Sequence, residues 1–270
     1  MNNLNNALSI SNIAWDPELD NKVGAILQEQ EVKFIDVAPS KYFKNFYETS
    51  YSEIEFVKEK WARFGIKIYG MQSLLFGFKQ VNLFSSVEDR ALMLSSLGEV
   101  CRIGRILGAR FLTFGSPKNR LIKGQNSKEI EEISLNFFYK LGQIAKENQV
   151  TICLEPNPKE YGANFLTTTM QAHNFVKKLN HPNIKMQLDT GTCILNEEDL
   201  ELLDNSTIGH IHASNPFLLP IDEQNVGQIK NKLNLLDKLE DKVVCIEMLC
   251  GRERSPVDVI KRSITLLRQN

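Results

Sequence analysis

Four residues in the second half of the chain could together bind a divalent metal ion. Glu155, Asp189, His212 and Glu247 each lie at or near the end of a short apolar run, and about one strand and one helix of chain separates each from the next. Four such side chains meeting in one place would repel one another and lose hydration unless a cation lay between them. Three carboxylates and one imidazole form a mixed oxygen and nitrogen ligand set that suits Mn²⁺, Mg²⁺, Co²⁺ or Zn²⁺. The pattern therefore predicts one divalent metal ion as a cofactor.

Each residue also has an ordinary structural interpretation. Glu155 can be a solvated acid at a strand end, and Asp189 can cap the turn into the next helix. One of the two histidines, His210 or His212, is expected to face the wall that the strands form, and His210 can be a hydrogen-bonded core histidine. Glu247 is the hardest to explain in this way, because apolar residues flank it on both sides. One shared site explains the four strand ends more simply than four separate accidents, so the joint pattern favours a metal site.

The elements that must position these residues alternate between strand and helix patterns. Eight short runs rich in β-forming residues are predicted to be strands, and a segment with helical periodicity follows each of them. Eight such units in 270 residues predict an α/β protein with the (β/α)8 TIM-barrel fold, as a single domain over residues 1–270. The alternative, a doubly wound open sheet, normally has fewer strands and often a glycine-rich first turn. The predicted strands are Leu8–Trp15, Lys33–Pro39, Lys67–Leu74, Arg110–Ser116, Thr151–Asn157, Ile184–Thr190, Gly209–Ser214 and Val243–Leu249.

Composition and charge argue against several other classes of protein. The formal net charge is −1, which gives no indication of a nucleic-acid partner, although a local basic patch is compatible with it. The five cysteines are scattered without a CxxC pair, so neither a disulfide framework nor a structural zinc site is indicated, and a reducing cytosol is the simplest compartment. No apolar run approaches the roughly 20 residues that span a membrane, and the N-terminus lacks the pattern of a signal peptide. We therefore expect a cytoplasmic protein without a membrane partner.

The ends of the last four predicted strands resemble those of the xylose isomerase-like TIM barrels, the sugar-phosphate isomerase and epimerase superfamily. The matching motifs are LEPNP, LDTGT, HIHASNP and IEM, and the resemblance covers nearly the whole chain. It implies that Glu155, Asp189, His212 and Glu247 are the metal ligands, with His212 preferred over His210 because "HASN" matches the family pattern. In the ketose epimerases of this family two glutamates act as acid and base on opposite sides of the substrate carbon. The resemblance therefore implies that Glu155 and Glu247 are the catalytic pair.

The resemblance implies a divalent-metal-dependent isomerase or epimerase of a sugar, sugar phosphate or sugar acid that works by proton transfer through an enediolate. A metal-dependent lyase or dehydratase acting on a sugar or inositol derivative, and a non-catalytic sugar-binding barrel, are the alternatives. Apurinic endonucleases of the same family use more histidines than the four in this chain. Tyr161, Thr192 and Leu218 depart from the epimerase pattern, which predicts a different substrate pocket beside the same metal ligands.

Residues in the predicted loops after the strands could bind the substrate. Lys118 and Arg120 follow the fourth strand and Arg252 follows the eighth, and both side-chain types bind phosphate or carboxylate groups well. A basic rim of this kind points to an anionic carbohydrate as the small-molecule partner, while solvated surface charge is the equally simple alternative. Gln72 and Asn157, near the ends of the third and fifth strands, could contact the substrate. A homo-oligomer is compatible with the sequence, which contains nothing that decides the oligomeric state.

Overall fold

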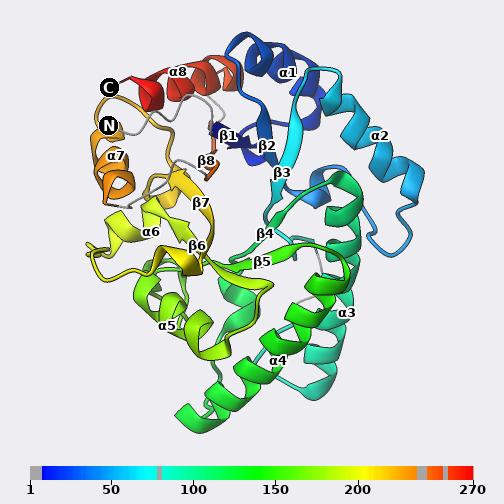
Figure 1. The fold of residues 1–270 in the computed structure, drawn as a ribbon, viewed down its shortest axis with the longest axis vertical. Helices are drawn as coiled ribbons and strands as arrows, with labels where there is room; N and C mark the ends of the chain where they lie inside the picture. The colour runs from blue at the N-terminus through cyan, green and yellow to red at the C-terminus, as the bar shows by residue number, and fades with distance from the viewer. Residues whose placement is uncertain (1–7, 78–80, 236–241, 252–254, 270) are drawn as a thin grey trace.

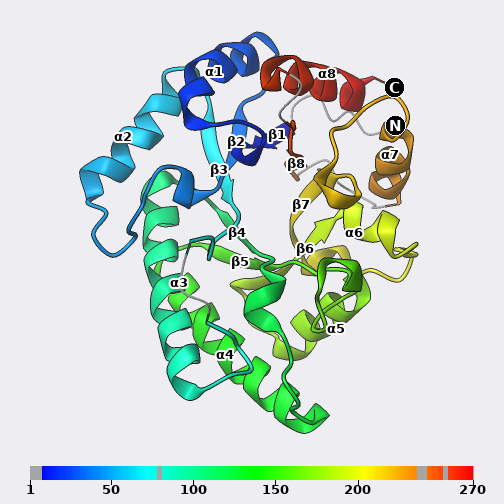
Figure 2. The ribbon, with the colours of Figure 1, turned by 180° about the vertical axis from the view of Figure 1, so that it is seen from behind.

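The strands of the protein form a closed barrel. The computed structural model describes residues 8–77, 81–235, 242–251 and 255–269. Eight parallel strands follow one another around the barrel in chain order, and β1 closes it by pairing with both β2 and β8. The helices lie outside the strands and surround them, as Figure 1 and the reverse view in Figure 2 show. This is the single (β/α)8 TIM barrel that the alternating sequence pattern predicts.

All eight predicted strands are present, and most end earlier than predicted. Pro39, Pro117 and Pro156 come shortly after three of these ends, and proline has no N–H to continue a ladder of hydrogen bonds. The strands are β1 (Leu8–Ser11), β2 (Phe34–Val37), β3 (Lys67–Met71), β4 (Phe111–Phe114), β5 (Thr151–Leu154), β6 (Ile184–Asp189), β7 (Ile208–Ser214) and β8 (Val244–Glu247). The early ends place several candidate site residues at the last strand position or just beyond it.

Helices cover the outside of the barrel, and several of them begin with a side-chain cap. They are α1 (Asp20–Glu29), α2 (Tyr51–Ala62), α3 (Val87–Leu107), α4 (Ser127–Glu147), α5 (Thr169–Leu179), α6 (Thr190–Leu195), α7 (Val226–Asn234) and α8 (Pro256–Arg268). Ser50 and Asn126 cap α2 and α4, and each forms a capping box with the glutamate three residues later. Apolar side chains on the inner helix faces, such as Leu97 and Leu141, are fully buried, and each such burial contributes roughly 1.5 to 3 kcal/mol.

The strand register sets the heights of the candidate metal ligands. Asp189 on β6 pairs with His212 on β7, and His212 pairs in turn with Cys245 on β8. Glu247 lies two residues further along β8, and Glu155 directly follows the end of β5. The four positions are therefore staggered along the barrel, although the last four strands each carry one of them at or near the C-terminal end.

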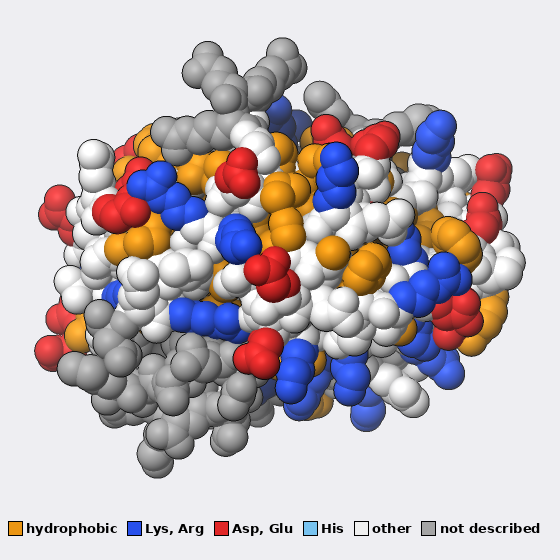
Figure 3. Space-filling view, turned by 90° about the horizontal axis from the view of Figure 1, so that it is seen from above, with side chains coloured by type: hydrophobic (Ala, Val, Ile, Leu, Met, Phe, Trp, Pro, Cys, Tyr) orange, Lys and Arg blue, Asp and Glu red, His pale blue; other side chains and the backbone are white. Residues whose placement is uncertain are grey.

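The surface carries charges of both signs. Figure 3 shows Lys and Arg side chains interspersed with Asp and Glu side chains on the face that it displays. This mixture agrees with the formal net charge of −1. Among the helices in the described part of the chain, none combines the length and apolar character that crossing a bilayer requires.

Candidate metal centre

Glu155, Asp189, His212 and Glu247 converge at the C-terminal end of the barrel. One potential ligand atom of each lies within 4.8 Å of the corresponding atoms of the other three. His212 is fully buried, whereas the side chains of Glu247 and Glu155 are 10% and 18% exposed. The cluster therefore opens toward solvent at the two glutamates. The structure brings together all four residues that the strand-end pattern singles out, while their role as metal ligands stays a prediction.

His212 presents its Nδ1 atom to the two glutamates. Nδ1 lies 3.1 Å from Oε2 of Glu247 and 3.5 Å from Oε1 of Glu155. The other ring nitrogen, Nε2, is buried and has no hydrogen-bond partner among the described residues. Nδ1 is therefore the nitrogen that could bind a metal ion together with the carboxylates.

Asp189 both caps a helix and belongs to the cluster. Its Oδ1 atom accepts the backbone N–H of Thr192 at 2.7 Å, at the start of α6, and its Oδ2 atom accepts the hydroxyl of Ser214 on β7. Ser214 in turn accepts the backbone N–H of Gly191 at 2.9 Å. The two interpretations of Asp189 are compatible, because each carboxylate oxygen has more than one lone pair. Sequence reasoning missed Ser214, whose contact depends on the register between β6 and β7.

The electrostatics of the cluster favour an added positive charge. Burial, together with the charges of Glu155 and Glu247, raises the pKa of Asp189 to about 7. Burial acts to lower the pKa of His212, but Glu247, Asp36 and Glu155 outweigh it and raise that pKa well above its ordinary value. The cluster thus binds protons near neutral pH, because crowded and buried carboxylates cannot all stay ionised without a positive charge beside them. Three carboxylates and an imidazole nitrogen at these separations fit a divalent cation in place of those protons.

Two residues expected to contact the substrate make hydrogen bonds within the site, and their contact with substrate stays a prediction. Gln72, just beyond β3, donates its side-chain amide to Oε1 of Glu247, and its own Oε1 atom is buried without a hydrogen-bond partner among the described residues. Asn157 donates to the backbone carbonyls of Glu155 at 3.1 Å and Gly115 at 3.5 Å. Gln72 therefore keeps an unused acceptor beside the proposed catalytic pair, whereas Asn157 holds the chain that follows β5.

The three basic residues expected at the rim have different environments. Lys118 is exposed in the 3-10 turn η5 (Pro117–Arg120) that follows β4. Arg120 ends the same turn but is 1% exposed, and its Nη2 atom donates to the backbone carbonyls of Gly115 and Glu155. This burial corrects the expectation that Arg120 lies on an open rim, because the guanidinium bridges the ends of β4 and β5. Arg252 lies outside the described residues.

An aromatic pair lies beside the carboxylates. The Tyr161 hydroxyl, in the loop after β5, accepts the backbone N–H of Phe217 at 2.8 Å, and the two ring centroids are 5.4 Å apart. Burial raises the pKa of Tyr161, and the charges of the three cluster carboxylates add to this effect. Phe217 and Leu218 both have positive φ angles, of 59° and 55°, which costs on the order of 1 to 3 kcal/mol at each residue. The hydrogen bond that Tyr161 accepts from Phe217 helps to hold this strained turn next to the site.

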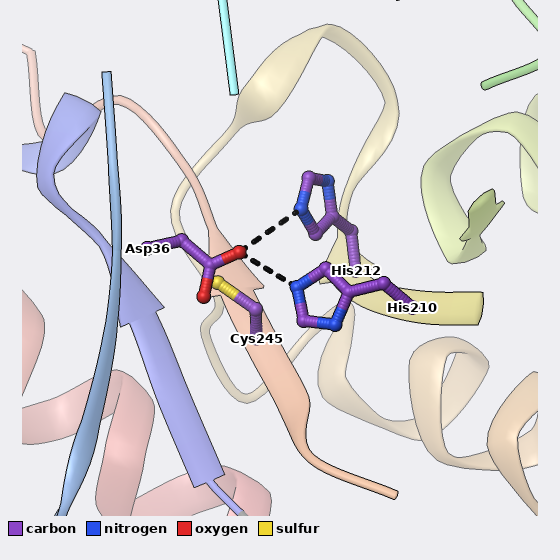
Figure 4. Close-up of side chains that lie close together, drawn as sticks. All are labelled: Asp36, His210, His212 and Cys245. Atoms are coloured by element: carbon purple, nitrogen blue, oxygen red, sulfur yellow. Dashed lines mark hydrogen bonds and ion pairs between the residues drawn. The ribbon is translucent and has the colours of Figure 1, made fainter. Parts of the chain in front are cut away.

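A second polar cluster lies deeper in the barrel, and sequence reasoning did not find it. Asp36 on β2 accepts a hydrogen bond from Nε2 of His210 at 2.6 Å (Figure 4). It also accepts one from the hydroxyl of Ser9 at 2.8 Å. Burial opposes ionisation of Asp36, but attraction and hydrogen bonding from His210 and His212 hold its pKa well below its usual range. Both histidines thus face the interior, which corrects the expectation that one faces the wall. Asp36 stands within the apolar run FIDV, the same signal that marks Glu247.

Comparison with known proteins identifies the family. The family model described as the xylose isomerase-like TIM barrel matches residues 26–270, and the chain belongs to this family. No curated protein sequence matches the chain.

Solved structures share the same fold at low sequence identity. The 3-keto-D-glucoside 4-epimerase of E. coli is 14% identical, with a TM-score of 0.77 over 97% of this chain and 98% of that chain. The D-psicose 3-epimerase of Clostridium cellulolyticum H10, solved with D-tagatose, is 16% identical, with a TM-score of 0.70 over 97% and 96% of the two chains. The IOLI protein with a bound zinc atom is 17% identical, with a TM-score of 0.69 over 96% of each chain.

Proposed function

We propose that this protein is a divalent-metal-dependent isomerase or epimerase of a carbohydrate. The observation that carries the proposal is the convergence of three carboxylates and the Nδ1 atom of His212 at the C-terminal end of the barrel, where TIM-barrel active sites lie. Two similar structures are epimerases that act on sugars, and a third contains zinc, which supports the same class of site. Glu155, Asp189, His212 and Glu247 would hold the cation.

Glu155 and Glu247 are the proposed acid and base. Their carboxylates lie 3.5 Å and 3.1 Å from Nδ1 of His212, and both side chains are partly exposed. One carboxylate would remove a proton from the carbon next to the substrate carbonyl, which gives an enediolate, and the other would return a proton to the opposite face. A bound divalent cation would supply the positive charge that stabilises the developing oxyanion. Gln72 would fix the orientation of Glu247, and Arg120 that of the chain carrying Glu155.

The substrate class follows from the same site. A vicinal carbonyl and hydroxyl offer two oxygens and an acidic carbon to such a centre, so the substrate is proposed to be a carbohydrate. The presence of an anionic group on that carbohydrate is a separate proposal that rests on Lys118, which is exposed in the turn after β4. Comparing a sugar with its phosphate or acid separates the two proposals.

The first experiment is the metal content of protein purified without chelator. We expect about one divalent ion per chain in the wild type and a clear loss in Glu247→Gln, since the amide is a weaker ligand than the carboxylate. Glu223→Gln is the matched control, because Glu223 is an exposed carboxylate paired with Arg262, and this variant should keep its metal.

Proton exchange in D2O then tests the reaction. Sugars, sugar phosphates and sugar acids would be screened by NMR for solvent deuterium at the carbon next to the carbonyl, with Glu155→Gln and Glu247→Gln as variants. Exchange that both variants abolish is the expected result. Loss of water from the substrate would point to a lyase instead. If the wild-type protein contains no metal and shows no thermal shift on adding Mn²⁺ or Zn²⁺, a non-catalytic sugar-binding barrel becomes the better interpretation.

A further inference from the structure

The proposed metal site leaves one nitrogen of His212 without a role. Nδ1 faces Glu247 and Glu155, so a neutral imidazole that binds a cation there must carry its proton on Nε2. Nε2 is buried, and no described residue forms a hydrogen bond with it. We propose that Asp36 is a positioning residue that accepts the Nε2 proton of His212 and so holds Nδ1 toward the metal site. This inference rests on the proposed metal-binding function.

The geometry around Nε2 points to Asp36. The Oδ2 atom of Asp36 lies 3.9 Å from Nε2 of His212, as the dashed line in Figure 4 marks. Closing this distance to a hydrogen bond requires about 1 Å of movement. Histidines that bind metal through one nitrogen commonly donate the other N–H to a carboxylate, which fixes the tautomer and the ring orientation. Asp36 lies on β2, whereas the four candidate ligands lie on or directly after β5 to β8, so Asp36 would support His212 without being one of those ligands.

The neighbours of Asp36 hold its carboxylate in this place. Ser9 donates to Oδ1 at 2.8 Å, and Nε2 of His210 lies 2.6 Å from Oδ2. The His210 ring stacks on Phe111 with an interplanar angle of 2° and centroids 5.7 Å apart. A Cβ atom on Gly70 of β3 would overlap Oδ2 of Asp36 and lie 2.6 Å from its Cγ, so the absence of a side chain at Gly70 makes room for the carboxylate.

A second metal ion is the competing interpretation of this cluster. Asp36, His210, His212 and Cys245 offer ligand atoms within 4.8 Å of one another. All four are buried, with at most 1% of their surface exposed, and Asp36 already accepts two hydrogen bonds. An ion would need a path into this sealed interior. The buried, hydrogen-bonded carboxylate of Asp36 therefore fits a supporting role better than the role of a metal ligand.

The test compares Asp36→Asn and Gly70→Ala with the wild type. Asp36→Asn keeps the side-chain volume and removes the anionic acceptor, and Gly70→Ala keeps Asp36 but displaces it. Asp20→Asn is the matched control, because Asp20 is also a buried carboxylate with three donors, Trp15, Tyr42 and Lys60. Each metal-free protein would be titrated with Zn²⁺, and ¹H–¹⁵N NMR of its four histidines would be recorded before and after the titration.

We expect about 10- to 100-fold weaker Zn²⁺ binding in Asp36→Asn and Gly70→Ala, and an affinity within about twofold of the wild type in Asp20→Asn. The Nε2 proton of His212 should be shifted downfield in the wild type and should lose this shift in Asp36→Asn. Wild-type affinity in both variants with an unchanged Nε2 signal would overturn the inference, as would a second equivalent of bound Zn²⁺ that Asp36→Asn removes. If Asp36→Asn does not fold, the Zn²⁺ affinity of Gly70→Ala and the Nε2 proton shift of the wild type test the inference.

The two proposals can fail separately. Wild-type protein that binds no Zn²⁺, Mn²⁺ or Mg²⁺ would contradict the proposed function, whereas the Nε2 signal of His212 would still report whether Asp36 accepts its proton. Metal binding in the wild type that is indifferent to Asp36 would contradict only the present inference.

Discussion

The carboxylate of Glu155 fills the space that a side chain on Gly115 would occupy. A Cβ atom on Gly115 would overlap Oε2 of Glu155 and lie 3.2 Å from its Cδ. Gly115 directly follows β4, and its carbonyl accepts from the buried guanidinium of Arg120. The end of β4 thus forms one side of the space that holds Glu155, so a change at Gly115 should alter the metal site without replacing a ligand.

Gly115→Ala is expected to weaken metal binding by about tenfold or more, because the added methyl group displaces Glu155, and to lower the free energy of unfolding by about 1 to 3 kcal/mol. Metal titration and thermal unfolding measure the two effects. Gly98→Ala is the control, because the nearest atom to its Cβ is Cγ2 of Ile144 at 3.8 Å and Gly98 lies inside α3. That change should leave metal binding unaltered and stabilise the fold by about 0.5 to 1 kcal/mol. Equal metal affinity in both variants would contradict the role assigned to Gly115.

Gln72→Leu is expected to lower kcat by about tenfold with little change in stability. The substitution removes the amide that donates to Oε1 of Glu247, and a proton-transfer group must be held within hydrogen-bond reach of its target. Gln72→Glu should be more damaging, since it places a fourth carboxylate beside the cluster. Steady-state kinetics on the substrate found by proton exchange would measure both. A rise in KM alone would mean that Gln72 binds the substrate and does not orient Glu247.

The metal-free protein is expected to lose stability as the pH rises through neutrality. The pKa of Asp189 is about 7 in the folded state against an ordinary value of 3.8, so the folded protein binds more protons than the unfolded chain between these values. Stability from this group is therefore fully present below about pH 4 and is lost as the pH rises through about 7, on the order of a few kcal/mol in total. Thermal unfolding with chelator from pH 5 to pH 8 would measure the slope.

Two controls accompany this pH series. Asp189→Asn should flatten the slope, and saturating Mn²⁺ should reverse it, because the cation replaces the protons that the carboxylates share. A slope that persists in Asp189→Asn would assign the effect to other groups, such as His212, whose pKa is also raised.

Arg120 and Lys118 are expected to respond differently to replacement by methionine. Arg120→Met should lower the free energy of unfolding by about 1 to 3 kcal/mol, because its buried Nη2 bridges two backbone carbonyls, and should leave the preference between neutral and anionic sugars unchanged. Lys118→Met, at an exposed position, should change stability by less than about 0.5 kcal/mol and raise KM for anionic substrates only. Denaturant unfolding and paired KM values test this. A selective KM effect in Arg120→Met would restore Arg120 to the substrate rim.

The local sequence determined the architecture and the strands that carry the four candidate ligands, and the family resemblance chose His212 over His210. Apolar runs alternating with helical periodicity predict the (β/α)8 barrel because burial imposes a different period on each element. In a parallel barrel all strands end at the same face, so polar residues at consecutive strand ends must lie near one another. Glu155 and Asp189 could therefore be grouped before any contact was known.

The tertiary structure alone decided what supports these residues. Gln72 contacts Glu247 across 175 residues of chain, and Asp36 contacts His210 across 174. Neither partner can be read from a local pattern, because such contacts depend on strand register and on barrel closure. The burial of Arg120 has the same origin. A charged residue in a loop is predicted from sequence to be exposed, whereas the ends of β4 and β5 bury this guanidinium in the structure. Sequence patterns thus predict which side chains reach the site, whereas packing between distant strands decides how each is held.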